Sequence, residues 1–185
     1  MIKEGYYRVT DVLGVYASFN KVNPEVLEAA KVRGTEVHDA CDDLIAGVIT
    51  NLEEHQGYIE SFKQWYLGKE FIKKPERFYC DKLMLTGECD AIYICPETRN
   101  LVLVDFKTPA RESKSWPLQG AAYYYLAKEV GIEIGKVEFV KLDKDGKKPK
   151  VFEYNHEENL PIFLKALELH KYFYKPSKDD VLDNE

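Results

Sequence analysis

The segment Val104-Asp105-Phe106-Lys107-Thr108 ends the apolar run 101–104 with an acid and a lysine two residues apart. Successive side chains of a strand point to opposite faces, so Asp105 and Lys107 are predicted to share one face. Burying two charges at the end of an apolar strand is costly unless they meet partners or a metal ion. An ion pair without chemistry and a metal-binding site are both consistent with this segment taken alone.

A second acid, Asp90, lies in the preceding apolar-rich segment, 87–94. An acid on one strand followed by Asp-x-Lys on the next resembles the motif with which nucleases of the PD-(D/E)XK superfamily hold a catalytic metal. Phosphodiester hydrolysis needs a deprotonated nucleophile, neutralisation of the developing charge and help for the leaving oxygen. Bound Mg²⁺ or Mn²⁺ can supply all three, and such hard cations prefer carboxylate oxygens.

Two further motifs extend this resemblance. Gln119 and Tyr123 are four residues apart on a predicted helix and therefore share a face, although a solvent-facing Gln beside a core Tyr also fits. His38 follows Arg33-Gly34-Thr35 on an earlier predicted helix, where a lone histidine is commonly a packing residue. In this order, with Gly87-x-x-Asp90 and Asp105-x-Lys107 between them, the motifs resemble the RecB-like branch of the superfamily over roughly residues 7–130.

The resemblance implies a metal-dependent site. Its implied metal ligands are His38, Asp90, Asp105 and the backbone carbonyl of Phe106, and its implied catalytic residues are Asp90, Asp105, Lys107, Gln119 and Tyr123. Lys107 would orient or activate the attacking water, or stabilise charge in the transition state. Glu76 corresponds, less firmly, to an acid often found on the strand before Gly-x-x-Asp. The expected cofactor is Mg²⁺ or Mn²⁺.

The cysteine pattern differs from that of some RecB-like nucleases, which hold a four-iron cluster with one early and three late cysteines. No cysteine follows Cys95, so no iron–sulfur cluster is expected. The resulting hypothesis is a DNA nuclease acting on single- or double-stranded ends, an exonuclease of recombination, repair or replication. A catalytically silent nucleic-acid-binding or scaffold protein on the same fold and a site-specific endonuclease remain alternatives.

The net charge of −6 does not exclude nucleic acid, because residues 39–60 carry six acids and no Lys or Arg. The rest of the chain is balanced, with 26 acids and 26 bases. Two basic clusters could follow a phosphate backbone or be solvated loops: Lys69, Lys73, Lys74 and Arg77, and Lys141, Lys144, Lys147, Lys148 and Lys150. Between the Asp-x-Lys strand and the next helix, Arg111 and Lys114 are predicted to hold phosphate and Trp116 to stack on a splayed base. Alternatively, Trp116 packs on the core.

The expected fold is α/β: a restriction-endonuclease-like sandwich with a small mixed central sheet flanked by helices. Thr10 is a candidate cap of a short first helix, and Asn23-Pro24 begins the next. Predicted helices cover 24–51, 58–67, 117–130 and 160–172, and predicted strands lie near 77–85, 88–95, 101–107, 136–142 and 150–154. One nuclease-like domain is expected over 1–175, with a flexible acidic tail at 176–185.

The connector 96–100 predicts an antiparallel hairpin, in which simple pairing sets Cys95 opposite Leu101 and Asp90 opposite Phe106. Asp90 is then one residue away from sharing a face with Asp105. A bulge or a one-residue change of register would correct this.

No apolar stretch approaches the ~18 residues that a membrane span needs. The segment 1–7 contains no apolar signal core, so a cytoplasmic protein of a bacterial or phage-infected cell is expected.

Overall fold

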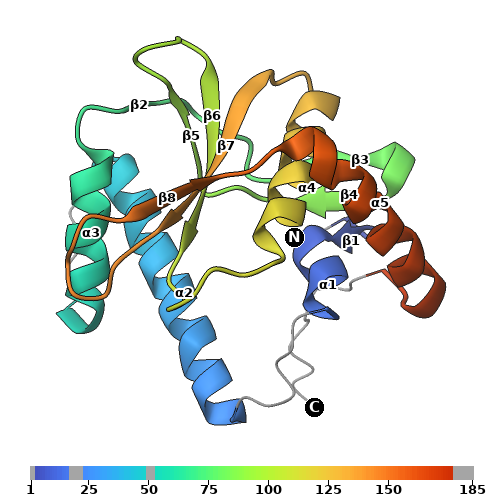
Figure 1. Ribbon diagram of the computed structural model, residues 1–185, viewed down its shortest axis with the longest axis horizontal. Helices are drawn as coiled ribbons and strands as arrows, with labels where there is room; N and C mark the ends of the chain where they lie inside the picture. The colour runs from blue at the N-terminus through green and yellow to red at the C-terminus, as the bar shows by residue number, and fades with distance from the viewer. Residues whose placement is uncertain (1–2, 17–22, 49–52, 177–185) are drawn as a thin grey trace.

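The computed structural model describes residues 3–16, 23–48 and 53–176 (Figure 1). Its elements, in chain order, are β1 (Tyr7–Arg8), α1 (Val9–Gly14), α2 (Pro24–Ile45), the 3₁₀ turn η2 (Glu53–His55), α3 (Gln56–Tyr66), β2 (Glu70–Phe71), β3 (Phe78–Cys80), the 3₁₀ turn η3 (Asp81–Leu83), β4 (Leu85–Gly87), β5 (Ala91–Ile94), β6 (Leu101–Lys107), α4 (Trp116–Glu129), β7 (Ile134–Lys141), β8 (Lys150–Glu153) and α5 (His156–Phe173).

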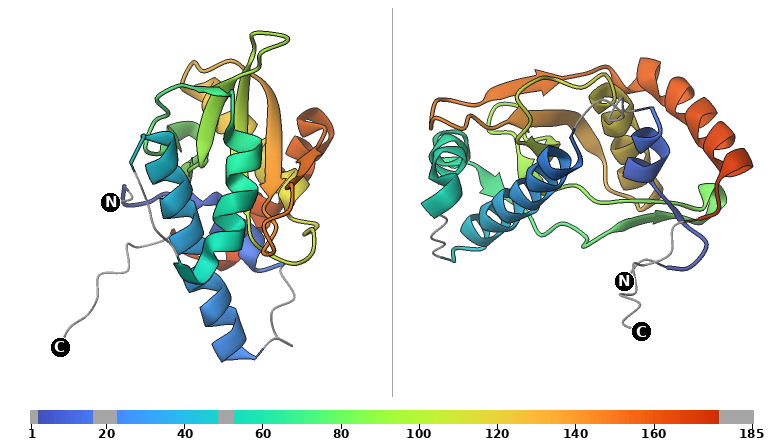
Figure 2. Two further views of the ribbon diagram at one scale, coloured as in Figure 1. Left: turned by 90° about the vertical axis from the view of Figure 1, so that its left-hand side faces the viewer. Right: turned by 90° about the horizontal axis from the view of Figure 1, so that it is seen from below.

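The central sheet has five strands in the order β2-β5-β6-β7-β8, and a second sheet has the order β1-β4-β3. The central sheet is mixed, because β6 pairs antiparallel with β5 and parallel with β7. Helices α2 and α3 cover one face of it, and α1, α4 and α5 lie on the other side (Figures 1 and 2). The predicted α/β sandwich with a small mixed sheet is therefore confirmed.

Strand β6 runs between the two halves of the core and has apolar side chains on both faces. Val102, Val104 and Phe106 are fully buried in the cluster formed with α2 and α3. Leu103 points the other way, into the cluster formed with α1, α4 and α5. Asp105 follows Leu103 by two residues and so belongs to the α4 face, near the end of a strand whose other residues, apart from Lys107, are all apolar.

Helix boundaries follow their capping signals. The Asn23 side chain accepts a hydrogen bond of 2.8 Å from the Glu25 amide and caps α2, with Pro24 in its first turn. Helix α2 ends at Ile45, earlier than the predicted residue 51. Just beyond this end, Gly47 takes a φ of +77°. Gly131, with a φ of +80°, follows the end of α4 as predicted.

Two local predictions were wrong. The strand predicted over 77–85 is divided into β3 and β4 by η3, after which Met84 adopts a left-handed φ of 44°. A methionine gives no sequence signal for that conformation, which favours Gly or Asn. Thr10 does not cap α1, since Arg8 occupies the cap position without a side-chain bond.

Within the described ranges, no helix is both long and apolar enough to cross a membrane. The predicted tail lies outside the described residues except for Pro176.

Candidate active site

The register of the β5–β6 hairpin brings the two predicted acids together. Ala91 pairs with Val104, so the next step of the ladder sets Asp90 opposite Asp105. The regular pairing ends at this point, because the Asp90 amide donates a 3.0 Å hydrogen bond to the carbonyl of Val104, which already pairs with Ala91. Opposed residues of an antiparallel pair share a face. The simple prediction of Asp90 opposite Phe106 was wrong, and the one-residue change of register is what the structure shows.

The hairpin connector explains this register. The Cys95 amide donates to the Asn100 carbonyl over 2.9 Å, and the Arg99 amide donates back to the Cys95 carbonyl. Arg99 takes a left-handed φ of 60° to close the turn. The loop therefore closes on Asn100, one residue before Leu101.

Asp105 is nearly inaccessible, at 3% exposure. Its Oδ2 lies 2.5 Å from the Lys107 Nζ, and its Oδ1 accepts a 3.2 Å hydrogen bond from the Gln119 amide nitrogen. Burial raises the pKa of Asp105 to about 6, although the Lys107 charge works in the opposite direction. The predicted sharing of one face by Asp105 and Lys107 is confirmed, and the pair lies within reach of α4.

Asp90 receives two donors of its own. The Phe106 amide donates to its Oδ2 over 2.5 Å, and the His38 Nδ1 lies 3.0 Å from its Oδ1. Burial opposes the charged form of His38, but attraction from Asp90 prevails and raises the histidine pKa to about 9. Burial likewise opposes the charged form of Asp90, and the His38 imidazolium nevertheless holds its pKa below the usual value. Helix α2 thus delivers His38 to the sheet, next to Asp90.

Gln119 connects the acid, the lysine and the tyrosine. Its Nε2 donates to Asp105 and, over 2.9 Å, to the Tyr123 hydroxyl. Its Oε1 accepts from Lys107 Nζ over 3.1 Å. All polar atoms of this buried amide are therefore engaged, and its orientation is fixed by its partners. Gly87 permits the arrangement, since a Cβ there would come within 2.8 Å of the Tyr123 ring.

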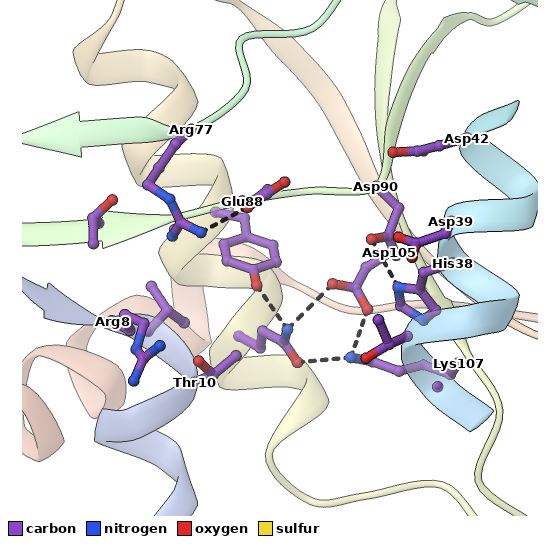
Figure 3. A pocket seen from close by; sticks show the side chains of 17 residues that line it. Arg8, Thr10, His38, Asp39, Asp42, Arg77, Glu88, Asp90, Asp105 and Lys107 are labelled. Atoms are coloured by element: carbon purple, nitrogen blue, oxygen red, sulfur yellow. Dashed lines mark hydrogen bonds and ion pairs between the residues drawn. The ribbon is translucent and has the colours of Figure 1, made fainter. Parts of the chain in front are cut away.

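These groups line a pocket of about 460 Å³ (Figure 3). The sequence did not assign several of its lining residues to the site, and named Arg77 only in a basic cluster; they come from five different elements or their ends: Arg8, Thr10, Asp39, Asp42, Arg77 and Glu88. Arg77 and Glu88 form an ion pair at 2.7 Å on the wall of the pocket. Asp39 and Asp42 follow His38 within about one helical turn, a spacing that could have identified them. Arg8 and Thr10 carried no comparable signal.

Two predicted residues require correction. Glu76 is exposed and lines a separate hollow with Arg77 and Glu88, outside the pocket that holds Asp90. Trp116 is only 3% exposed and stacks on Phe139 with ring centroids 5.8 Å apart. It begins α4 on its core-facing side, so its ring has no free face for a base. The alternative that it packs on the core is confirmed.

Arg111 and Lys114 are exposed on the connector between β6 and α4, and neither lines the pocket. Their predicted contact with phosphate stays a prediction.

The donor set of the pocket suits a hard cation. The Asp105 Oδ2 is buried, and its partner is the Lys107 ammonium rather than a neutral donor. The N–H and C=O of a strand residue point to the same neighbour, so the Phe106 carbonyl faces the Asp90 side, as its amide does. As the side chains stand, no three His, Cys, Asp or Glu residues in the described part of the chain are arranged to hold a metal ion. A cation would have to displace the His38 proton and exchange the His38–Asp90 contact for its own.

Neither a comparison with protein-family models nor one with curated proteins finds a match. Among solved structures, the chain is similar to the protein SSO0001, with a TM-score of 0.46 and 15% identity over 91% of this chain and 78% of that one. It is also similar to an alkaline exonuclease, LHK-Exo, from Laribacter hongkongensis, with a TM-score of 0.43 and 13% identity over 91% of each chain. The complex of LHK-Exo with dAMP gives a TM-score of 0.44 and 12% identity over 91% of each chain. Likeness at this level carries no inference about function, which has to come from the side chains of the pocket.

Proposed function

We propose that this protein is a metal-dependent deoxyribonuclease that hydrolyses phosphodiester bonds in DNA, and that it acts as an exonuclease. The observation that carries the proposal is the convergence of two carboxylates, the buried Asp105 and the partly buried Asp90, in one open pocket with the Lys107 ammonium against Asp105. Carboxylates are placed together in this way at a cost, because like charges repel and burial opposes ionisation. A divalent cation removes both penalties.

The proposed ligands are Asp90, Asp105 and His38, with the Phe106 carbonyl as a further one. Mg²⁺ or Mn²⁺ bound there would lower the pKa of a water molecule and neutralise charge on the phosphate. Both are hard cations that take carboxylate oxygens, and the buried Asp105 Oδ2 has only the Lys107 ammonium as its counter-charge.

Lys107 is proposed to act on the phosphate or the attacking water. Its ammonium is held between Asp105 and the Gln119 carbonyl oxygen, so it stays in one place while charge develops nearby. The side chain also lies 5.4 Å from the Phe139 ring centroid and 6.0 Å from that of Trp116. Trp116 therefore contributes to the site from the core side, as part of the wall behind the lysine.

Gln119 and Tyr123 are proposed to position Asp105 and Lys107. Tyr123 is buried, and burial together with the Asp105 charge keeps its pKa well above the usual value, so the hydroxyl remains protonated. It accepts from Gln119, and Gln119 in turn fixes the relative placement of Asp105 and Lys107. The exonuclease assignment rests on the resemblance of His38, Gly87-x-x-Asp90, Asp105-x-Lys107 and Gln119-x-x-x-Tyr123 to the RecB-like branch.

The test is incubation with end-labelled linear DNA and with circular DNA, in Mn²⁺ and in chelator. We expect linear DNA to be degraded from its ends in Mn²⁺ alone, while circular DNA stays intact. Cleavage of the circle would indicate an endonuclease. Binding of DNA without cleavage under any of these conditions would contradict catalysis and favour a silent binding protein.

A further inference from the structure

A second cavity, of about 350 Å³, lies next to the proposed active site and shares no lining residue with it. It is bounded by the first half of α2, the start of α3 and the ends of β6 and β7. The adjacent residues Arg33 and Gly34 line different cavities. Gly34 lines the active-site pocket, and Arg33 lines the second cavity. Lys107 and Thr108 are divided in the same way. The two cavities therefore lie on either side of the place where Gly34 of α2 comes close to Thr108 at the end of β6.

Two cations in this second cavity have no acidic partner among the described residues. The Arg33 Nε is buried without a hydrogen bond, and its guanidinium lies 6.0 Å from the centroid of the Tyr58 ring. Lys141, at the end of β7, takes part in none of the ion pairs that the described side chains form. A guanidinium with an unused buried donor, beside an uncommitted ammonium, is suited to an anion with several acceptor oxygens.

The acids near this cavity are already engaged. The Asp143 carboxylate accepts a 2.9 Å hydrogen bond from the Asp145 amide within its own turn. Asp145 pairs with Lys144 at 3.3 Å and with Lys147 at 4.0 Å. Neither acid is therefore in an ion pair with Arg33 or Lys141, although the Lys141 charge does act on Asp143.

The wall that carries Lys141 is held firmly against α3. The Asp143 amide donates to the Ser61 hydroxyl over 2.9 Å, and the Gln64 side chain donates to the Gly146 carbonyl over 2.6 Å. Gly57 allows the closest approach, because a Cβ there would lie 1.8 Å from the Lys144 carbonyl oxygen. A preformed cavity of this kind binds a ligand without first having to order its own walls.

We propose that this cavity is a phosphate subsite for the DNA strand being cleaved, a proposal that rests on the proposed function. The strand leaves the Asp90–Asp105 pocket over Gly34 and sets a backbone phosphate, beyond the scissile one, against Arg33 and Lys141. Gly34 leaves that path open, since the nearest atom to a Cβ built there is the Thr108 Oγ1 at 4.0 Å. The part of the strand outside the active-site pocket is thus recognised by charge.

The experiment compares two substrates and three variants. A p-nitrophenyl ester of thymidine 5′-monophosphate reaches the active-site pocket alone, whereas a long single-stranded oligonucleotide reaches both cavities. The variants are Arg33→Gln, Lys141→Gln and, as a matched loss of one charge on an exposed part of α4, Lys128→Gln. Oligonucleotide binding is measured in chelator, so that it does not depend on cleavage.

We expect Arg33→Gln and Lys141→Gln each to weaken oligonucleotide binding by about 10- to 100-fold. Each should also reduce the slope of log K against log salt concentration by about 0.7, as expected when one contact to a single strand is lost. The ratio of oligonucleotide to ester cleavage should fall by a similar factor. Lys128→Gln should change neither. Binding and salt slope that fall no further in Arg33→Gln and Lys141→Gln than in Lys128→Gln would overturn the subsite.

The path over Gly34 has its own test. Gly34→Gln replaces a helical glycine with a better helix former, in a place with room for a side chain, so the fold should be retained. The new side chain would stand between the cavities, and oligonucleotide binding should weaken by at least about tenfold. Binding equal to that of the parent would overturn the path. If the parent cleaves neither substrate but the variants show the expected losses of binding, the nuclease function fails while the subsite stands.

Discussion

Two buried acids on neighbouring strands share a pattern but differ in surroundings. Asp105 on β6 pairs with Lys107, and Glu138 on β7 pairs with Lys136 at 2.7 Å, so each acid has a lysine two residues away. Each acid also has one buried oxygen without a hydrogen bond. The pairs point to opposite faces of the sheet, because Phe139 and not Glu138 joins the α4 side of the core.

The difference lies in what surrounds each pair. Glu138 accepts a 3.1 Å hydrogen bond from the Tyr93 hydroxyl, and the Tyr93 ring packs edge-on against Trp65 of α3. The nearest further acid, Glu153, is exposed and lies across Lys136. Asp105 instead lies beside a second, partly buried acid, Asp90, in an open pocket. An acid and a lysine at this spacing therefore do not identify a site, whereas a second acid and a pocket beside them do.

The largest contrast is expected between Asp105→Asn and Glu138→Gln. Asp105→Asn removes a proposed metal ligand while keeping its shape, so cleavage of linear DNA in Mn²⁺ should fall by at least about a thousandfold. The protein should stay folded, because the amide keeps the shape of the side chain and Lys107 keeps its hydrogen bond to Gln119. Glu138→Gln should leave cleavage within a few-fold of the parent. Comparable cleavage by the two variants would erase the distinction between the two acids.

The two lysines provide the next contrast. Lys107→Met should reduce cleavage by about 100- to 1,000-fold while Mn²⁺ affinity, measured by calorimetry, stays near that of the parent. Lys136→Met should leave cleavage intact and lower the free energy of unfolding by about 2 kcal/mol, because Glu138 is left buried without its cation. The loss is smaller than for a fully buried pair since Lys136 is partly exposed. If Lys107→Met loses Mn²⁺ affinity as completely as Asp105→Asn does, Lys107 does not act on the phosphate or the water.

A smaller effect is expected from His38 in metal-free protein. Its folded-state pKa of about 9 lies above its usual value of 6.5, so the folded state holds the proton more tightly. The stabilisation is fully present below pH 6.5 and is lost as the pH rises through about 9. Denaturant unfolding in chelator should therefore show a decline over this window that His38→Gln removes. An equal decline in parent and variant would show that the His38–Asp90 contact is not its source.

Strong local signals predicted much of the fold. The Asn23-Pro24 start of α2 and the Gly131 end of α4 were readable because capping depends on a few adjacent residues. The division of 77–85 was not, since the left-handed conformation falls on Met84. The hairpin register was not predicted for the same reason. Arg99 adopts the left-handed conformation in the turn, and only a glycine there would have indicated it from the sequence.

The site was predictable where its residues form spaced motifs. His38, Asp90, Asp105, Lys107 and Gln119 all reach one pocket from separate segments, in agreement with the motif order. Arg8 and Glu88 were missed, and Arg77 was assigned only to a basic cluster, because their approach depends on the second sheet, whose pairing is long-range. The sequence left open whether Trp116 stacks on a base or packs on the core, because its burial depends on Phe139, more than twenty residues away.

The most direct measurement is anomalous scattering from crystals grown with Mn²⁺. The two-carboxylate site predicts a manganese peak in the pocket beside Asp90, Asp105 and His38, which would hold the ion. The same crystals should show no peak at Glu138. Saturating Mn²⁺ that leaves the Asp90–Asp105 pair without a peak, with His38 still bonded to Asp90, would contradict the account.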